Sequence, residues 1–527
     1  MLRLTGILFS AVILIAACGG NDVNDEITGQ ETVVMTDITV APASVDIRMG
    51  DTLRLTVTPS PTGATGQPFE WISNNPDVAE VSANGLITAI TQGNAVVTVR
   101  SGSISKKIAV TVDGIARMKI SGIAYDVTTL DTEELSEGVK WYKLSLPEFE
   151  NGVKDATAVA GKGLVINVVI ADLSNPDNKL EVVSALPVNL TETPSSVYNR
   201  KTTELNASGR KPVVVVNGDQ WRMNWAVATG DPYGYDRSRP NGVEVCNGMV
   251  GESPLVETAG FYIKDNGSMG FASFAIAGTV DAGSATCSFS VVNGYAVQGE
   301  LALFNNSAHC WPTDSAFAWS PYVSTYVSLS YPQGGWRVNE RMEFSVTNIE
   351  NNISTTIPSN INQYANAGGK SFNGEGAILV GNGASGTFLS TLSVGDKIGV
   401  TTDVKINGTK TTDKHLNAIG CLGSAMLQNG TPNENTTKDA QPRTSAGNSK
   451  DGKTAIIAVI DGRQTNYSTG VTLPQVGHIM KALGAYTAVN LDGGGSSVMV
   501  VKGEIKNRPS DGAERAVANE LMITVKK

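Results

Sequence analysis

The run LVINVVI at residues 164–170 decides the fold of the longer part of the chain. It is apolar almost throughout, and so are VVVV at 213–216 and AIIAVI at 455–460. Continuous apolar runs of this length are typical of strands that a sheet buries on both faces. The three runs therefore predict central, buried strands.

One helix is predicted after the third run. Apolar residues recur with the i, i+3, i+4, i+7 spacing of a single buried helix face from Val476 to Leu483. Pro474 falls in the first turn, where a missing N–H is tolerated, and Gly484 suits a C-terminal cap. With a strand expected at 488–491, the order is strand, helix, strand, which is typical of an α/β or α+β domain.

The N-terminal part has a different pattern. Apolar and polar residues alternate at 53–57, 97–99 and 108–112, so each of these short strands buries one face, as in a β-sandwich. The expected fold class is multi-domain: an N-terminal all-β sandwich followed by a large α+β domain with a mixed sheet. The expected divisions are a signal peptide at 1–17, a tether at 18–35, the sandwich at 36–113, a linker at 114–134 and the large domain at 135–527.

Size and charge narrow the classes of function. With 527 residues, of which 41% are hydrophobic, the chain can bury several cores. Lys and Arg number 40, whereas Asp and Glu number 50, so the net charge is −10 at pH 7. Since an acidic chain without a basic run is poorly suited to hold nucleic-acid phosphates, no nucleic-acid partner is expected.

The first residues predict export. Arg3 precedes an apolar run at 7–17 that is short for a membrane span, as in a signal peptide. The sequence LIAACG at 14–19 resembles a lipobox, in which a peptidase cuts before a lipid-bearing cysteine. We expect a lipoprotein anchored to the bacterial membrane through Cys18, at the outer membrane or cell surface. An ordinary signal peptide with a chance cysteine is the alternative.

Four more cysteines follow, Cys246, Cys287, Cys310 and Cys421. An exported protein can form disulfides, and four cysteines allow three sets of pairings. Their wide, irregular spacing is unlike that of a zinc site. Two disulfides and four buried thiols stay equally open.

Polar clusters stand at the ends of the apolar runs, where sheet proteins gather ligands. They include three carboxylates, Asp219, Asp461 and Asp492, each at or near the end of a predicted strand. Cleavage of a glycosidic bond generally uses one carboxyl as an acid and another as a base or nucleophile. Each aspartate is equally open to a second interpretation, as a turn cap or an arginine partner.

The last cluster contains three consecutive glycines, Gly493 to Gly495, between Asp492 and Ser496-Ser497. A wide hairpin turn would explain them. The alternative is a nest of backbone N–H groups around a phosphate or sulfate. No Gly-Lys-Ser/Thr follows, so the run is no P-loop and does not indicate nucleotide hydrolysis.

Four arginines strengthen the anion interpretation. Arg443, Arg463, Arg508 and Arg515 stand in or near turns that contain Gly, Pro or Ser. A guanidinium binds phosphate through two parallel hydrogen bonds. Each arginine taken alone could still be a solvated surface charge.

The 3 histidines are widely separated, which disfavours a two-metal phosphodiesterase.

Two families resemble parts of this sequence. WISNNPDVA at 71–79 and GLITA at 85–89 resemble the bacterial Ig-like domain of group 2, a spacer or adhesive module. Residues 135–527 resemble the phosphodiester glycosidase domain, most densely from residue 443 onward. The segments that carry this second resemblance are RTSAG at 443–447, VIDGRQ at 459–464, NLDGGGSS at 490–497, NRPSDG at 507–512 and ERAVAN at 514–519.

The resemblance implies hydrolysis of the anomeric C–O bond of a sugar-1-phosphate diester of the N-acetylglucosamine type, which releases free sugar and a phosphomonoester. The partner is then a phosphodiester-linked glycan. The implied catalytic residues are Asp461, Asp492, Arg443 and Arg463. The implied substrate-binding residues are Asn217, Asp219, Gly493, Gly494, Gly495, Ser496, Ser497, Arg508, Arg515 and Asn519.

Two departures from the family pattern lie beside this site. Asp219-Gln220-Trp221 stands where the family usually has a second glycine and two aromatics, and Gln441 stands where it usually has histidine. They bear mainly on substrate identity. The second hypothesis for function is a cell-surface lipoprotein that binds carbohydrate without turnover. No cofactor is expected to be required, and a structural Ca²⁺ among Asp and Asn side chains is a third hypothesis.

Overall fold

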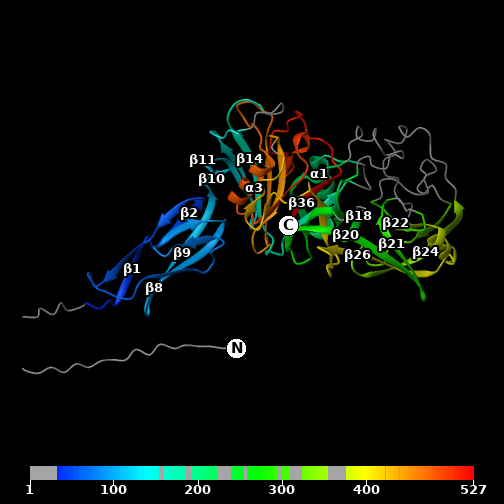
Figure 1. Cartoon of the computed structure of the whole chain (residues 1–527), viewed down its shortest axis with the longest axis horizontal. Helices are drawn as coiled ribbons and strands as arrows, with labels where there is room; N and C mark the ends of the chain where they lie inside the picture. The colour runs from blue at the N-terminus through cyan, green and yellow to red at the C-terminus, as the bar shows by residue number, and fades with distance from the viewer. Residues whose placement is uncertain are drawn as a thin grey trace, which may run out of the picture.

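The computed structural model describes residues 33–152, 159–185, 191–221, 239–253, 258–294, 298–307, 323–353, 376–421, 423–437 and 439–527. From left to right in Figure 1, these residues form a small N-terminal sandwich, a central layered unit and a second β-rich unit. Within the described ranges, no helix has both the length and the apolar character needed to span a bilayer. The predicted signal peptide, most of the tether with Cys18, and Cys310 lie outside these ranges.

The N-terminal sandwich, residues 37–115, consists of short strands with alternating buried and exposed side chains. Its strands are β1 (Asp37–Ala41), β2 (Ser44–Met49), β3 (Thr52–Arg54), β4 (Thr56–Ser60), β5 (Glu70–Ser73), β6 (Ala79–Val81), β7 (Leu86–Ala89), β8 (Gly93–Ser101) and β9 (Ile104–Ile115). Buried side chains recur at every second residue along much of β8 and β9, which are antiparallel neighbours. The predicted one-faced strands are confirmed.

The central unit contains two sheets packed face to face. The first has the order β12 (Thr128–Ser136), β13 (Val139–Leu146), β14 (Leu164–Asp172), β32 (Thr454–Ile460), β31 (Arg443–Asn448), β33 (Thr487–Asn490), β29 (Leu427–Gln428), β30 (Thr431–Pro432). The second has the order β15 (Asn178–Ser184), β36 (Asn519–Lys526), β16 (Arg210–Asn217), β34 (Met499–Val501), β35 (Glu504–Ile505). Both sheets contribute to one core, which includes Val169, Val214, Val459 and Leu521. The three apolar runs are therefore the buried strands β14, β16 and β32, as predicted.

Helices cover the outer faces of these two sheets. The described α-helices are α1 (Pro194–Glu204), α2 (Gly383–Ser390) and α3 (Leu473–Ala482). α3 packs Val476 into the core on the outer face of the first sheet, and α1 packs Val197 against the second sheet. α3 starts with a capping box, in which Thr472 and Gln475 each accept the other's backbone N–H. The helix predicted before Gly484 is confirmed, and the two helices flank the central sheets in Figure 1.

The β-rich unit is a 12-stranded sheet with its own apolar core and α2 beside it. Its order is β18 (Met249–Glu252), β17 (Glu244–Cys246), β28 (Asn417–Gly420), β19 (Thr258–Ile263), β20 (Met269–Ala282), β21 (Ala285–Val292), β22 (Leu301–Asn305), β25 (Ala377–Asn382), β23 (Ser324–Leu329), β24 (Arg341–Ile353), β26 (Lys397–Ile406), β27 (Thr409–Lys410). The prediction of a large α+β domain is corrected here, because the described part after residue 135 is mainly strand. Strands such as β20 alternate buried and exposed residues, so the sequence there lacks the continuous apolar runs that marked the central strands.

The N-terminal sandwich packs on the central unit beside the connecting hairpin of β10 (Arg117–Ile120) and β11 (Ile123–Asp126). The Tyr142 hydroxyl lies 2.9 Å from Gln92 Oε1 and 3.0 Å from Asp113 Oδ1. Lys140 pairs with the same Asp113 carboxylate at 2.9 Å. The apolar core continues from the N-terminal strands to α3. The module expected to be a spacer is therefore held against its neighbour.

Three of the four cysteines discussed above are free thiols, Cys246, Cys287 and Cys421. Two disulfides would need all four cysteines, so that alternative is wrong. Burial raises the pKa of Cys287 and Cys421, as expected for thiols with no catalytic role.

Candidate functional site

Three neighbouring strands bring the predicted catalytic residues to one edge of the first sheet. β31 is antiparallel to both β32 and β33, and Arg443 at its start pairs with Ile460 at the end of β32. Asp461 directly follows β32, and Asp492 follows β33 by two residues. Since adjacent strands lie about 4.8 Å apart, the two aspartates are separated by about 10 Å, with Arg443 on the strand between them.

Asn217, the last residue of β16, ties the second sheet to this edge. Its Nδ2 donates to the Asp492 carbonyl at 2.9 Å, and its Oδ1 accepts from Thr444 Oγ1 at 2.7 Å and from the Val498 N–H at 3.1 Å. The next carbonyl, that of Gly218, accepts the Asp492 N–H at 2.9 Å. Asn217 is fully buried, so it positions the Asp492 turn from beneath.

Asp492 is half-buried at the centre of this edge. Its Oδ1 accepts the Gly493 N–H at 2.9 Å, and the Ser496 side chain is a second hydrogen-bond partner. Burial raises the pKa of this carboxyl, whereas these hydrogen bonds and the charges of Arg515 and Arg443 oppose the rise. Burial outweighs these groups, so the pKa of the carboxyl stays above its ordinary value.

Two arginines flank Asp492 on the side of β31. Arg443 is buried, and its guanidinium donates to the Asp439 carbonyl at 2.9 Å and to the Val471 carbonyl at 3.3 Å. Burial lowers the pKa of Arg443, and the Asp439 carboxylate opposes this change. Arg463 Nε donates to Gln441 Oε1 at 2.6 Å. Both guanidinium groups are thus held in fixed positions by protein oxygens.

The glycine run is a tight turn whose backbone donors are already used. The N–H groups of Gly493, Gly494, Ser496 and Ser497 each donate to an oxygen of the protein. These four groups therefore form no open nest around an anion in this conformation. The hairpin interpretation is wrong as well, because the strands on either side, β33 and β34, belong to different sheets. The run forms a single 3-10 turn, Gly494–Ser496, that connects the two sheets.

The same glycines leave room for arginine side chains. A Cβ atom on Gly494 would lie 3.1 Å from Arg463 Nη2, and one on Gly495 would lie 2.3 Å from Arg515 Nη2. Arg515 also donates to Ser496 Oγ at 3.2 Å and forms an ion pair with Asp511. An anion at this edge would therefore meet guanidinium groups, which the glycines allow to approach the turn.

Asp461 belongs to a separate group of contacts. Its Oδ1 accepts from Asn507 Nδ2 and from the Arg508 N–H, both at 3.1 Å, and its Oδ2 accepts from the Tyr467 hydroxyl at 3.1 Å. The Arg508 guanidinium lies 5.3 Å above the Tyr467 ring. Burial raises the pKa of Asp461 to about 6. This carboxylate fixes the loop that carries Arg508.

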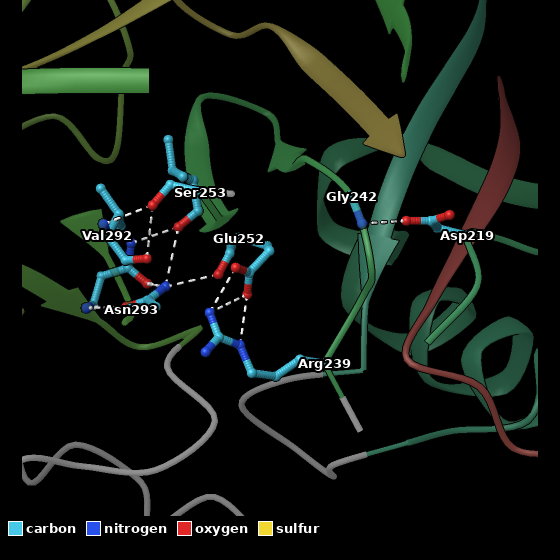
Figure 2. Close-up of polar contacts among 10 residues, drawn as sticks. Asp219, Arg239, Gly242, Glu252, Ser253, Val292 and Asn293 are labelled. Atoms are coloured by element: carbon cyan, nitrogen blue, oxygen red, sulfur yellow. Dashed lines mark hydrogen bonds and ion pairs between the residues drawn. The ribbon is translucent and has the colours of Figure 1, made fainter. Parts of the chain in front are cut away.

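Asp219 lies beside the Asp492 turn and is bound into a third chain segment. Its N–H donates to Asn519 Oδ1 at 2.9 Å, and its Oδ2 accepts the Gly242 N–H at 2.8 Å (Figure 2). Asn519 Nδ2 in turn donates to Glu244 Oε2 at 2.8 Å. Burial raises the pKa of Asp219 to about 7, and the charges of Asp492 and Glu244 add to the rise.

Most of the residues selected from the sequence gather around Asp492. They are Asn217, Asp219, Arg443, Arg463, Gly493, Gly494, Gly495, Ser496, Arg515 and Asn519. Asp461 and Arg508 lie in the neighbouring group, and the Ser497 hydroxyl is buried with no hydrogen-bond partner in the described part of the chain. Sequence reasoning missed Asp439, Gly242 and Glu244, since no pattern in their own segments marks them.

Other possible binding features do not coincide with this edge. A cavity of about 920 Å³ lies between the N-terminal sandwich and α3, and none of the strand-end site residues lines it. Across the described ranges, no group of three or more His, Cys, Asp or Glu side chains is arranged to hold a metal ion. The hypothesis of a structural Ca²⁺ stays a prediction.

The fold and site define a class of protein: a multi-domain, β-rich protein with a carboxylate set among arginines at a sheet edge. The family comparisons extend this. Residues 351–524 match the family described as phosphodiester glycosidase, and residues 34–112 match the bacterial Ig-like domain of group 2. Both resemblances seen in the sequence are confirmed within these ranges, whereas the expected bounds of the glycosidase domain, 135–527, stay a prediction.

Individual relatives are more distant. The SPbeta prophage-derived protein YomE of Bacillus subtilis (strain 168) is 41% identical over 83 residues, which are 16% of this chain and 13% of that protein. An exported protein of Burkholderia pseudomallei is similar in structure, with a TM-score of 0.51, 18% identity and coverage of 78% of this chain and 98% of that one. The catalytic domain of zebrafish N-acetylglucosamine-1-phosphodiester alpha-N-acetylglucosaminidase, auto-inhibited by its pro-peptide, is 12% identical, with a TM-score of 0.34 and coverage of 76% and 88%. The Burkholderia structure supports the fold alone.

Proposed function

We propose that the protein is a glycosidase that cleaves the anomeric C–O bond of a sugar-1-phosphate diester of the N-acetylglucosamine type. The products are free sugar and a phosphomonoester. One observation carries the proposal: Asp492, half-buried at a sheet edge, faces the charges of Arg443 and Arg515. A carboxylate that can act at a sugar carbon thereby stands next to cations that can hold a phosphate.

In this reaction the ionised Asp492 removes a proton from water while the water oxygen bonds to the anomeric carbon. The electron pair of the C–O bond passes to the phosphate oxygen, which leaves with the phosphomonoester. A phosphomonoester has a second pKa of about 6, so it leaves with little help from a general acid. Arg443, Arg463 and Arg515 stabilise its charge, and Asp461 acts indirectly, because it positions Arg508.

Hydrolysis in ¹⁸O-labelled water tests the reaction. The full-length protein should place heavy oxygen in the released sugar, whereas label in the phosphate would make the protein a phosphodiesterase instead. Asp492→Asn should lower kcat at least about 100-fold, the usual scale for loss of a proton-transfer group. Asp396→Asn, in an exposed turn of the β-rich unit, is the control and should retain full activity.

A second candidate function is carbohydrate binding at the cell surface without turnover. Gln441 stands where the family usually has histidine, and its Oε1 accepts a hydrogen bond from Arg463 Nε at 2.6 Å. Binding of sugar phosphodiesters with no sugar release at any pH would favour this function.

The proposed hydrolysis needs no cofactor, so extensive treatment with a chelator should leave sugar release unchanged.

We also propose that the protein acts outside the cytoplasm as a lipoprotein. The Ig-like domain and the exported Burkholderia protein of similar fold support an extracellular location. The lipobox-like sequence around Cys18 supports the anchor. Incorporation of labelled palmitate by the wild type, and none by Cys18→Ser, would establish it.

A further inference from the structure

Asp219 is a carboxyl at a position where the family pattern usually has glycine. Its side chain is only 2% exposed, and its Oδ2 accepts the Gly242 N–H at 2.8 Å. Two glycines form the walls around it. A Cβ atom would lie 2.2 Å from Asp219 Oδ2 if placed on Gly420, and 3.0 Å if placed on Gly242. The absence of both side chains therefore makes room for this carboxyl.

The segment that supplies the Gly242 N–H is itself fixed. Arg239 and Glu252 form a bidentate ion pair, with Nε to Oε2 at 2.7 Å and Nη2 to Oε1 at 2.6 Å. Figure 2 shows this pair close to the chain that runs on to Gly242, whose N–H points at Asp219. Both side chains of the pair are largely buried, so the contact is well shielded from water. The donor to Asp219 is therefore part of a rigid arrangement.

Asp219 and Asp492 belong to two turns that are clamped together. Asn217 Nδ2 donates to the Asp492 carbonyl, and the Asp492 N–H donates to the Gly218 carbonyl, both at 2.9 Å. Asp219 is the residue that follows Gly218. Its carboxyl therefore lies near that of Asp492, and the Asp492 charge acts on it.

Burial raises the pKa of both carboxyls, but their charged neighbours differ. Asp492 accepts the Gly493 N–H and faces the charges of Arg443 and Arg515, which oppose the rise. Among the residues that the structure describes, the charged groups that act on Asp219 are both acidic, Asp492 and Glu244, and the Cys421 thiol is a further titratable neighbour. Within the same ranges, the groups that oppose the penalty of burying an ionised Asp219 are backbone N–H groups.

We propose that Asp219 is a positioning residue that keeps one proton beside Asp492, so that the pair carries a single negative charge, on Asp492. This inference rests on the proposed function. In the reaction Asp219 keeps its proton, Asp492 receives the proton from water, and the bonding electrons leave with the phosphomonoester. Carboxyl pairs whose surroundings favour opposite protonation states divide their roles in this way.

The consequence is a change in substrate binding with pH. Burial, with the nearby Asp492 charge, raises the pKa of Asp219 to about 7. Below this pH the pair has one negative charge. Above it, an ionised Asp219 adds a second charge that repels a phosphodiester anion and increases the proton affinity of Asp492.

Kinetics across pH 5.5–8.5 test this role with a sugar-1-phosphate diester as substrate. We expect the wild-type KM to rise at least about fivefold above pH 7, which corresponds to about 1 kcal/mol. In Asp219→Asn, which cannot ionise, the rise should disappear. Asp396→Asn, at an exposed carboxylate of the β-rich unit, is the control and should keep the wild-type rise. In Glu244→Gln, which removes one of the two charges that raise the Asp219 pKa, the rise should move to lower pH. A rise in Asp219→Asn equal to that of the wild type would overturn the proposal.

A second measurement does not depend on turnover. In protein labelled with ¹³C at aspartate carboxyls, the Asp219 signal, assigned by its loss in Asp219→Asn, should titrate near pH 7. In Asp492→Asn its pKa should fall, because a neighbouring negative charge is removed. An unchanged pKa would refute the carboxyl pair. An inactive wild type with coupled titration would instead refute the proposed function and leave the pair in place.

Discussion

The two strand-end aspartates differ in what surrounds them. Asp461 accepts hydrogen bonds from Tyr467, Asn507 and the Arg508 N–H, so donors of the protein occupy its carboxylate. Asp492 is less buried and faces cations. A carboxylate whose oxygens already accept hydrogen bonds from the protein is better suited to hold a loop in place than to transfer a proton. For this reason we assign Asp461 the positioning of Arg508 and Asp492 the chemistry.

This assignment predicts how stability depends on pH. Burial raises the pKa of Asp461 from 3.8 to about 6, so the folded protein holds a proton that the unfolded chain has lost between these values. Stability from this group is therefore fully present below pH 3.8 and is lost as pH rises to about 6, by about 3 kcal/mol in all. Asp461→Asn removes this loss. The melting temperature of the variant should rise relative to the wild type between pH 4.5 and pH 7.5.

The control for this prediction is Asp511→Asn, at a half-exposed carboxylate that pairs with Arg515. Its melting temperature should follow that of the wild type across the same pH range. If Asp461→Asn also follows the wild type, burial does not raise the pKa of this carboxyl in the folded protein.

The sequence could predict some of these residues and not others. Arg443, Asp492 and Arg515 lie in motifs at predicted strand ends, and the structure brings them together. Glu244 lies on β17, which pairs with β28 so that Glu244 is opposite Ile419, more than 170 residues later in the chain. No local pattern marks Glu244 or Gly242 as part of the site. Their role depends on long-range packing, which a single sequence does not reveal.

At the level of elements, secondary structure could be predicted from the sequence where one hydrophobic pattern ran through the whole element. The run at 164–170 became β14, with eight consecutive buried residues, and the spacing from Val476 to Leu483 became α3. The strands of the 12-stranded sheet were not foreseen. Strands such as β20 and β26 alternate buried with more exposed residues, and their pairing joins residues far apart in the chain.

The capping box of α3 makes an element-scale prediction. Thr472 is buried at the N-cap, and its side chain accepts the Gln475 N–H. Thr472→Ala should destabilise the start of the helix by about 1 kcal/mol, because it leaves this donor without a partner. Hydrogen exchange of the first-turn amides of α3 should become faster. Thr472→Ser retains an acceptor oxygen and should exchange at nearly the wild-type rate; equally fast exchange in both variants would argue against the cap.

At the scale of the whole molecule, the Ig-like domain is more than a spacer. Its core is continuous with the core beneath α3, and Asp113 at the end of the domain pairs with Lys140 on β13. The sequence predicted the domain but not its docking, since the contact residues on each side are ordinary polar and apolar residues. Docking fixes the position of the Ig-like domain relative to the central unit.

Tyr142 is the side chain through which this docking can be tested. It is only 2% exposed, and its hydroxyl lies 2.9 Å from Gln92 and 3.0 Å from Asp113, both in the Ig-like domain. Tyr142→Phe keeps the ring but leaves these acceptors without the hydroxyl, at a cost of about 1–3 kcal/mol. Because the lost contacts join two units, the cost should appear as opening between them, with faster hydrogen exchange and proteolysis at 113–127.

Tyr331→Phe is the matched control, since that ring is 54% exposed and lies against Trp336 in the β-rich unit. It should leave exchange at 113–127 unchanged. If Tyr142→Phe also leaves it unchanged, the two units are joined only by the chain, and the Ig-like domain is free to move as a spacer. If exchange increases there while the core strands β14 and β32 stay protected, the interface is a separate, weaker layer of stability, as expected for contacts between domains.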